Sequence, residues 1–183
     1  MHTLHKNGQA MVPEVVVFGC GNVLLGDDGF GPAVIEALSG ADLQSAVQLV
    51  DAGTAIRDHL LDYLMLPALR PRVLIVVDAC DPCTDAVQAG QVRRMQPAAL
   101  PLRKSHDYSL HQFPTVNLLV ELEQETGIKV ELFVAPLVVI PERIAPGLSP
   151  SMQAAVGEAR DRILDCIRSY FAGRLPGGDY HDL

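Results

Sequence analysis

The chain has 183 residues, 49% of them hydrophobic and 20% charged, which is typical of one globular domain with a continuous core. Its formal net charge of −8 disfavours a surface that follows nucleic-acid phosphates. No apolar run reaches the length of a membrane span, and residues 1–13 lack the apolar stretch of a secretory signal. We expect a cytoplasmic monomer that binds neither nucleic acid nor a membrane.

Strand and helix patterns alternate along the chain. Strands are predicted at residues 15–18, 47–50, 73–77 and 129–134, with a shorter and more polar strand at 91–95. Helices are predicted at residues 29–38, 54–65, 115–125 and 149–172, with Thr54 and Ser149 as N-caps. This alternation predicts an α/β protein, a three-layer αβα sandwich with a mostly parallel central sheet. We expect a single α/β domain over residues 14–172, a flexible segment before it (1–13) and a loose tail after it (173–183).

Acidic side chains follow two of the predicted strands. Asp27 and Asp28 come after the first strand and a glycine turn, and Asp78 comes directly after the apolar strand 73–77. Because ligands bind beyond the carboxyl ends of the strands in open α/β sheets, these positions indicate a site. His106 and His111 precede the third helix. Two carboxylates and an imidazole could bind a divalent transition ion or serve as general acid and base.

Simpler roles remain open for these residues. Asp27 or Asp28 could cap the helix that follows them, and Asp78 could do the same after its own strand. Cys80 and Cys83 form a C-x-x-C, but no second pair completes a zinc site. We therefore interpret the cysteines as structural thiols and not as zinc ligands or a redox pair.

The glycines of the first loop also suggest a dinucleotide fingerprint. Gly19 and Gly21 match its beginning, but Leu24 stands where the third glycine is required, and acids stand where a pyrophosphate would bind. There is no Walker A sequence. A nucleotide-binding α/β module is therefore the less favoured alternative, and we expect no organic cofactor.

The run of residues 19–31, Gly-Cys-Gly-Asn-Val-Leu-Leu-Gly-Asp-Asp-Gly-Phe-Gly, resembles the signature of the NiFe-hydrogenase maturation endopeptidases. The likeness continues at residues 51–54, 75–79 and 109–114 and into the last helix, so that it spans residues 15–170. It implies a three-layer α/β hydrolase. Such an enzyme removes the C-terminal extension of a hydrogenase large-subunit precursor after nickel has been inserted.

The resemblance also implies a site. Asp28, Asp78 and His111 match the family's nickel-recognising residues, and they are the catalytic candidates of an aspartyl-type protease. Many members carry glutamate at the position of Asp28. His111 is preferred to His106 because it keeps the family's spacing to Pro114.

In this interpretation the nickel is carried by the substrate, and the partner is the precursor. Asp51 would help to position the extension, and Asp27 would orient Asp28. The attacking group, a metal-bound hydroxide or a carboxylate-activated water, stays open. A non-catalytic metal-binding chaperone with the same three ligands is the main alternative, and it would bind the precursor without shortening it.

Overall fold

The computed structural model describes residues 12–80, 90–99, 113–137, 141 and 143–173, without the side chains of residues 113–116. The strands are β1 (Val15–Cys20), β2 (Val47–Gly53), β3 (Val73–Cys80), β4 (Arg93–Met95) and β5 (Lys129–Pro136). The helices are α1 (Phe30–Ser39), α2 (Ile56–Met65), α3 (Phe113–Thr126) and α4 (Pro150–Phe171). Short 3-10 turns are η1 (Gly26–Gly29), η2 (Pro67–Leu69) and η3 (Pro97–Ala99). The expected terminal segments lie almost entirely outside the described residues.

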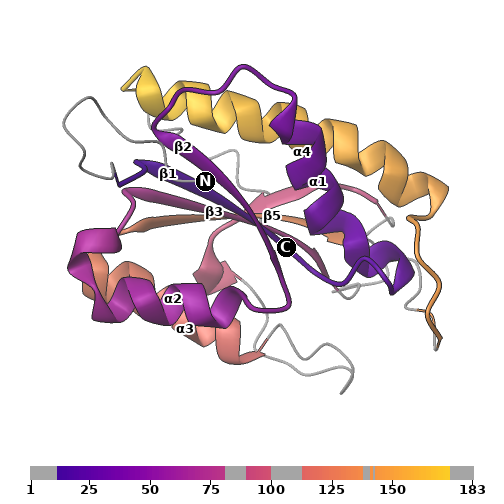
Figure 1. Ribbon diagram of the computed structural model, residues 1–183, viewed down its shortest axis with the longest axis horizontal. Coiled ribbons are helices and arrows are strands. Elements are labelled where there is room, and N and C mark those ends of the chain that lie inside the picture. The colour runs from indigo at the N-terminus through magenta and orange to yellow at the C-terminus, as the bar shows by residue number, and fades with distance from the viewer. Residues whose placement is uncertain (1–11, 81–89, 100–112, 138–140, 142, 174–183) are drawn as a thin grey trace.

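The strands form one sheet in the order β2-β1-β3-β5-β4. All neighbours are parallel except β4, which runs antiparallel to β5. Helices α1 and α4 cover one face of the sheet, and α2 and α3 cover the other (Figure 1). The three-layer αβα sandwich with a mostly parallel sheet is therefore confirmed.

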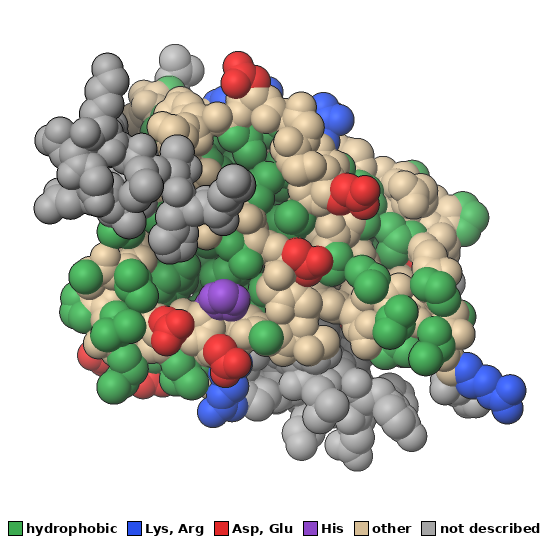
Figure 2. All heavy atoms as spheres, viewed as in Figure 1, with side chains coloured by type: hydrophobic (Ala, Val, Ile, Leu, Met, Phe, Trp, Pro, Cys, Tyr) green, Lys and Arg blue, Asp and Glu red, His purple; other side chains and the backbone are tan. Residues whose placement is uncertain are grey.

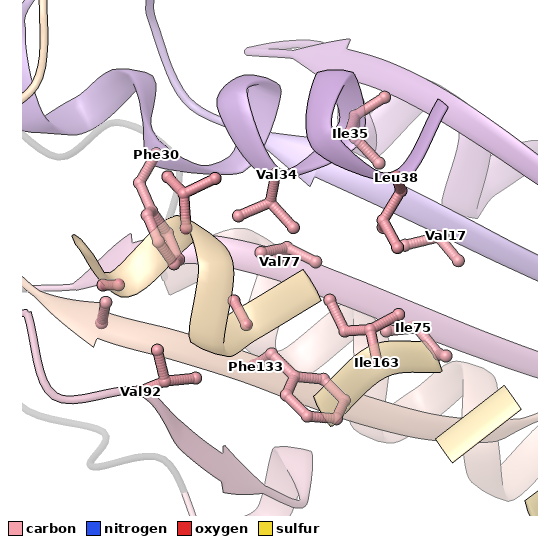
Figure 3. Packing of buried hydrophobic residues seen from close by; sticks show 14 of the residues in the cluster. Val17, Phe30, Val34, Ile35, Leu38, Ile75, Val77, Val92, Phe133 and Ile163 are labelled. Atoms are coloured by element: carbon pink, nitrogen blue, oxygen red, sulfur yellow. The ribbon is translucent and has the colours of Figure 1, made fainter. Parts of the chain in front are cut away.

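The central strands are buried on both faces, as continuous apolar parallel strands require. Alternate residues of β1 point to opposite layers: Val17 packs toward α1 and α4, and Phe18 packs toward α2 and α3. Figure 3 shows the first of these clusters, in which Val34 of α1 and Ile163 of α4 contact the sheet.

One charged cluster interrupts the apolar interior. The Glu131 carboxylate is buried in β5, with the Arg94 guanidinium of β4 at 3.0 Å and the Lys129 ammonium at 2.9 Å. The Arg94 guanidinium carbon also lies 6.0 Å from the centre of the Phe133 ring. These contacts tie the short antiparallel edge strand to the rest of the sheet.

The strands extend further than their apolar runs predict. β3 continues through Asp78 to Cys80, because its pairing with β5 continues to Pro136. β2 continues through Asp51 to Gly53. Asp51 and Asp78 therefore lie within the last residues of strands and not in the loops behind them.

One of the two predicted helix caps is confirmed and the other is wrong. Ser149 caps α4, where its side-chain oxygen accepts a hydrogen bond from the Met152 backbone N–H. The Thr54 cap is wrong: Ala55 occupies the N-cap position of α2, and no side chain caps that end. Among the described residues, no helix is long and apolar enough to cross a membrane.

Candidate active site

Glycines shape the loop that carries the two adjacent acids. Gly21 has a φ of 125°, and a Cβ placed there would overlap the Asp28 carbonyl oxygen. A side chain at Gly31 would overlap the backbone of Cys20, so the first turn of α1 packs directly against the end of β1. The glycine pattern is therefore explained by close backbone packing, which accounts for it without a nucleotide.

Asp28 is held in this loop by two hydrogen bonds. One oxygen of its carboxylate accepts a hydrogen bond from the Asn22 backbone N–H at 2.8 Å, and its own N–H donates to the Leu25 carbonyl at 3.2 Å. Gly29, and not an aspartate, occupies the N-cap position of α1, with no side-chain cap bond. The carboxylate of Asp28 is therefore not used to cap the helix.

Asp78 lies near the carboxyl end of β3, close enough to Asp28 for the two charges to interact. Burial and the neighbouring Asp28 carboxylate raise the pKa of Asp78 to about 8, although a hydrogen bond from the Ala79 N–H at 2.9 Å favours the ionised form. At neutral pH the pair therefore retains a proton. A divalent cation at this position would take the place of that proton, because it stabilises both ionised carboxylates.

The pKa of the Cys20 thiol is also affected by the nearby acids. Its thiol is buried at the end of β1, and burial together with Asp78, Asp51 and Asp28 raises its pKa. A thiol with a raised pKa is a poor nucleophile at neutral pH. This supports the interpretation of Cys20 as a small core residue. Cys80 is likewise buried, and Cys83 lies outside the described residues.

The predicted histidine ligand, His111, and its alternative, His106, both lie outside the described residues. Within the described part of the chain, no group of three or more histidine, cysteine, aspartate or glutamate side chains could hold a metal ion. The structure thus brings Asp28 and Asp78 together. The third ligand of the predicted site is not tested by it.

Asp27 has a different hydrogen-bond partner from its neighbour Asp28. Its side chain is only 3% exposed, and one carboxylate oxygen accepts a hydrogen bond from the Ser149 backbone N–H at 2.6 Å. A backbone hydrogen bond from Ala145 to the Leu24 carbonyl, at 2.9 Å, joins the same two segments. The first acid of the pair therefore anchors the loop to the start of α4.

Asp51 lies at the exposed end of β2, where its carboxylate accepts a hydrogen bond from the Gly53 N–H at 3.1 Å. It borders a groove with a volume of about 470 Å³ beside α1 and the acidic loop. The groove also includes Gly26 and Gly29, which flank the two acids. Asp51 is thus near the acidic pair but opens to solvent.

A family model described as hydrogenase maturation protease matches residues 32–166. The chain belongs to this family. Its members are named as proteases, so the protein is a hydrolase. The match begins inside α1, after the acidic loop. The loop's own resemblance to the same family therefore comes from residues that the family model does not match.

The chain is also similar to hydrogenase-related proteins over most of their length. The chain is 29% identical over 172 residues to the hydrogenase 2 maturation protease of Escherichia coli, covering 92% of this chain and 99% of the relative. It is 31% identical over 158 residues to the delta subunit of coenzyme F420 hydrogenase from Methanothermobacter thermautotrophicus, covering 84% and 94%. A solved hydrogenase maturating endopeptidase from E. coli superposes with a TM-score of 0.64 at 27% identity, covering 86% of this chain and 93% of that one.

Two features of this maturation protease have no local sequence signal. The partner of Asp27 is Ser149, 122 residues away, and no periodic pattern relates the two. The groove is formed by segments from three parts of the chain. The S-P sequence before α4 does indicate a helix start, but it does not indicate that this start also holds the acidic loop.

Proposed function

We propose that this protease removes the C-terminal extension of a NiFe-hydrogenase large-subunit precursor after nickel has been inserted. The observation that carries the proposal is that Asp28, in the loop after β1, lies close enough to Asp78, near the carboxyl end of β3, for their charges to interact. Both acids stand at positions where the sequence resembles the family's metal-recognising residues. We further propose that the enzyme acts as a cytoplasmic monomer.

In the proposal, Asp28, Asp78 and His111 recognise the nickel of the precursor. Two lines of argument support His111. Asp78 lies on the side of the sheet covered by α2 and α3, because its alternate neighbours Val76 and Cys80 pack there. Helix α3 leads from the carboxyl edge of the sheet to the start of β5, and it begins two residues after His111 in the sequence.

The ligand set suits nickel as cargo of the substrate. Oxygen and imidazole donors are acceptable to a borderline divalent ion, and three protein ligands leave positions for water and for the scissile carbonyl. The proton held by the Asp28–Asp78 pair would be released when the ion arrives. Cleavage would then depend on the metal, and the enzyme would act only on precursor that already carries nickel.

The two other acids have supporting roles in this proposal. Asp27 would fix the loop so that Asp28 keeps its direction toward the site. Asp51 would help to position the extension of the precursor at the outer end of β2. A non-catalytic chaperone with the same ligands would bind the precursor equally well, so only a change in precursor length separates the two functions.

The test is to incubate the purified protein with nickel-loaded precursor and to measure the mass of the product. We expect loss of the mass of the C-terminal extension, and no loss from nickel-free precursor. D28A and D78A should abolish cleavage, whereas D42A, an exposed acid outside the site, should cleave normally. Binding of the precursor without any change in its mass would contradict the protease function. Complete cleavage of nickel-free precursor would contradict metal recognition.

A further inference from the structure

The groove beside the acidic loop is large enough to bind part of another molecule. Its volume of about 470 Å³ falls within the usual range for ligand sites. The outer surface of α1 lines it through Ala33 and Glu36, and the segment before α4 lines it through Leu148. Asp51 lies at the end of β2, and Val23 lies on the side of the acidic loop.

The charge of the groove has one sign. Among the described residues, Glu36 and Asp51 line it, and no Lys, Arg or His does. None of the ion pairs between described residues involves either acid. Figure 2 shows acidic side chains in the middle of the face that carries α1 and β2, with Lys and Arg side chains toward its margins. A ligand with a positive charge therefore complements this surface.

Apart from Gln153, the rest of the described lining is apolar or glycine, and the apolar character continues onto the surface beside it. Val23 is 53% exposed and Leu24 46% exposed at the rim of the acidic loop. Ile144, which is 72% exposed, lies next to Ala145, and Ala145 is hydrogen-bonded to Leu24. A ligand for this surface therefore combines apolar side chains with a cation, as a peptide segment can.

The groove is continuous with the acidic loop. Gly26 and Gly29, which flank Asp27 and Asp28, form part of its lining. A polypeptide bound at the acidic loop therefore has the groove beside it. Of the two sides of the cleaved bond, the extension is the one that departs as a separate peptide, so a groove that is open to solvent suits its release.

We propose that this groove binds the C-terminal extension of the precursor in an extended conformation, with a Lys or Arg side chain directed at Glu36 and apolar side chains against Val23 and Leu148. The inference rests on the proposed function, because it takes the extension as the segment removed. Glu36 is here a specificity-determining residue for substrate binding. It does not touch the reacting bond.

The kinetic test uses nickel-loaded precursor and two variants at one position. E36K should raise KM about tenfold and E36Q about threefold, with kcat within about twofold of wild type, because the contact acts in binding and not in bond cleavage. E125K is the matched control, since Glu125 is exposed on α3 in the opposite layer. An unchanged KM in E36K, beside a wild-type enzyme that cleaves, would overturn the groove assignment.

Two further measurements separate this inference from the proposed function. A synthetic peptide with the sequence of the extension should bind the wild-type protein without nickel, and E36K should weaken that binding about tenfold. Changing a Lys or Arg of the extension to Glu should restore cleavage by E36K. If wild-type enzyme does not shorten the precursor, the proposed function fails. The peptide-binding measurement then still tests the groove. Equal affinity of the peptide for wild type and E36K, or no binding to either, would overturn the groove assignment.

Discussion

The carboxylate of Asp27 accepts a hydrogen bond from the backbone N–H of Ser149 at 2.6 Å, although the two residues are 122 positions apart. Ser149 is the N-cap of α4, so a single buried acid joins the acidic loop to the start of the last helix. Adjacent acids thus have separate tasks. Asp27 points inward and holds the loop, while Asp28 interacts with Asp78.

Removing the carboxylate of Asp27 should destabilise the protein. In D27A the Ser149 N–H loses a charged acceptor in a buried position, and we expect the free energy of unfolding to fall by about 1.5–3 kcal/mol. D27N keeps an oxygen acceptor of similar shape and should lose less. Urea unfolding at pH 7 measures the free energies of unfolding of D27A and D27N relative to wild type. Equal stability of D27A and wild type would show that water replaces the contact without cost.

The stability of the protein should depend on the ionisation of Asp78. Its pKa is 3.8 ordinarily and about 8 in the folded protein, so the folded state keeps a proton that the unfolded state loses. The resulting penalty on folding is absent below pH 4, grows as pH rises, and is complete above pH 8. D78N cannot ionise, so its stability advantage over wild type should grow by about 1 kcal/mol per pH unit between pH 5 and pH 7.

The measurement for this prediction is urea unfolding of wild type and D78N at pH 5, 6, 7 and 8. D42N serves as the control, because Asp42 is an exposed acid outside the site. A constant difference between D78N and wild type would mean that Asp78 ionises normally in the folded protein.

The sequence predicts which segments form strands and helices, but it predicts their exact ends less well. The apolar run 73–77 predicts a central strand because a parallel strand covered on both faces has no polar alternation. The same rule places its end too early, since Asp78 continues the ladder with β5. Thr54 fails as a cap because α2 begins at Ile56, one residue later than a Thr54 cap requires.

The site was predictable in part for a related reason. Asp28 and Asp78 follow strong strand patterns, and parallel strands end at the same edge, so their approach follows from local sequence. The contact between Asp27 and Ser149 and the groove depend on the packing of α1 against α4, which local patterns do not encode. The histidine ligand stays a prediction from resemblance.

Two histidine variants test that prediction. H111A should lose processing of nickel-loaded precursor, because the proposed site would keep only two carboxylates. H106A should be milder, with a rate within about tenfold of wild type, since it removes no ligand in this assignment. Mass measurement of the cleaved precursor, with circular dichroism to confirm folding, compares the two. An inactive H106A beside an active H111A would assign the ligand to His106.

The pair Cys80 and Cys83 should be dispensable. Replacing Cys80 with alanine and Cys83 with serine removes any zinc or disulfide role while leaving a small residue at the buried position. We expect processing close to the wild-type rate and a modest loss of stability from the smaller side chain. Loss of activity in a variant that still folds would assign a chemical role to the pair.

The close backbone contacts at Gly21 and Gly31 limit what sequence variation in this loop can reveal. Any side chain at these positions collides with main-chain atoms, so a saturation library would lose every substitution there whether or not the substrate is present. Intolerance at Gly21 and Gly31 therefore measures assembly of the loop, not recognition of the precursor. Val23 and Leu24, which are exposed beside them, are the loop positions where a selection for cleavage would report on the client protein.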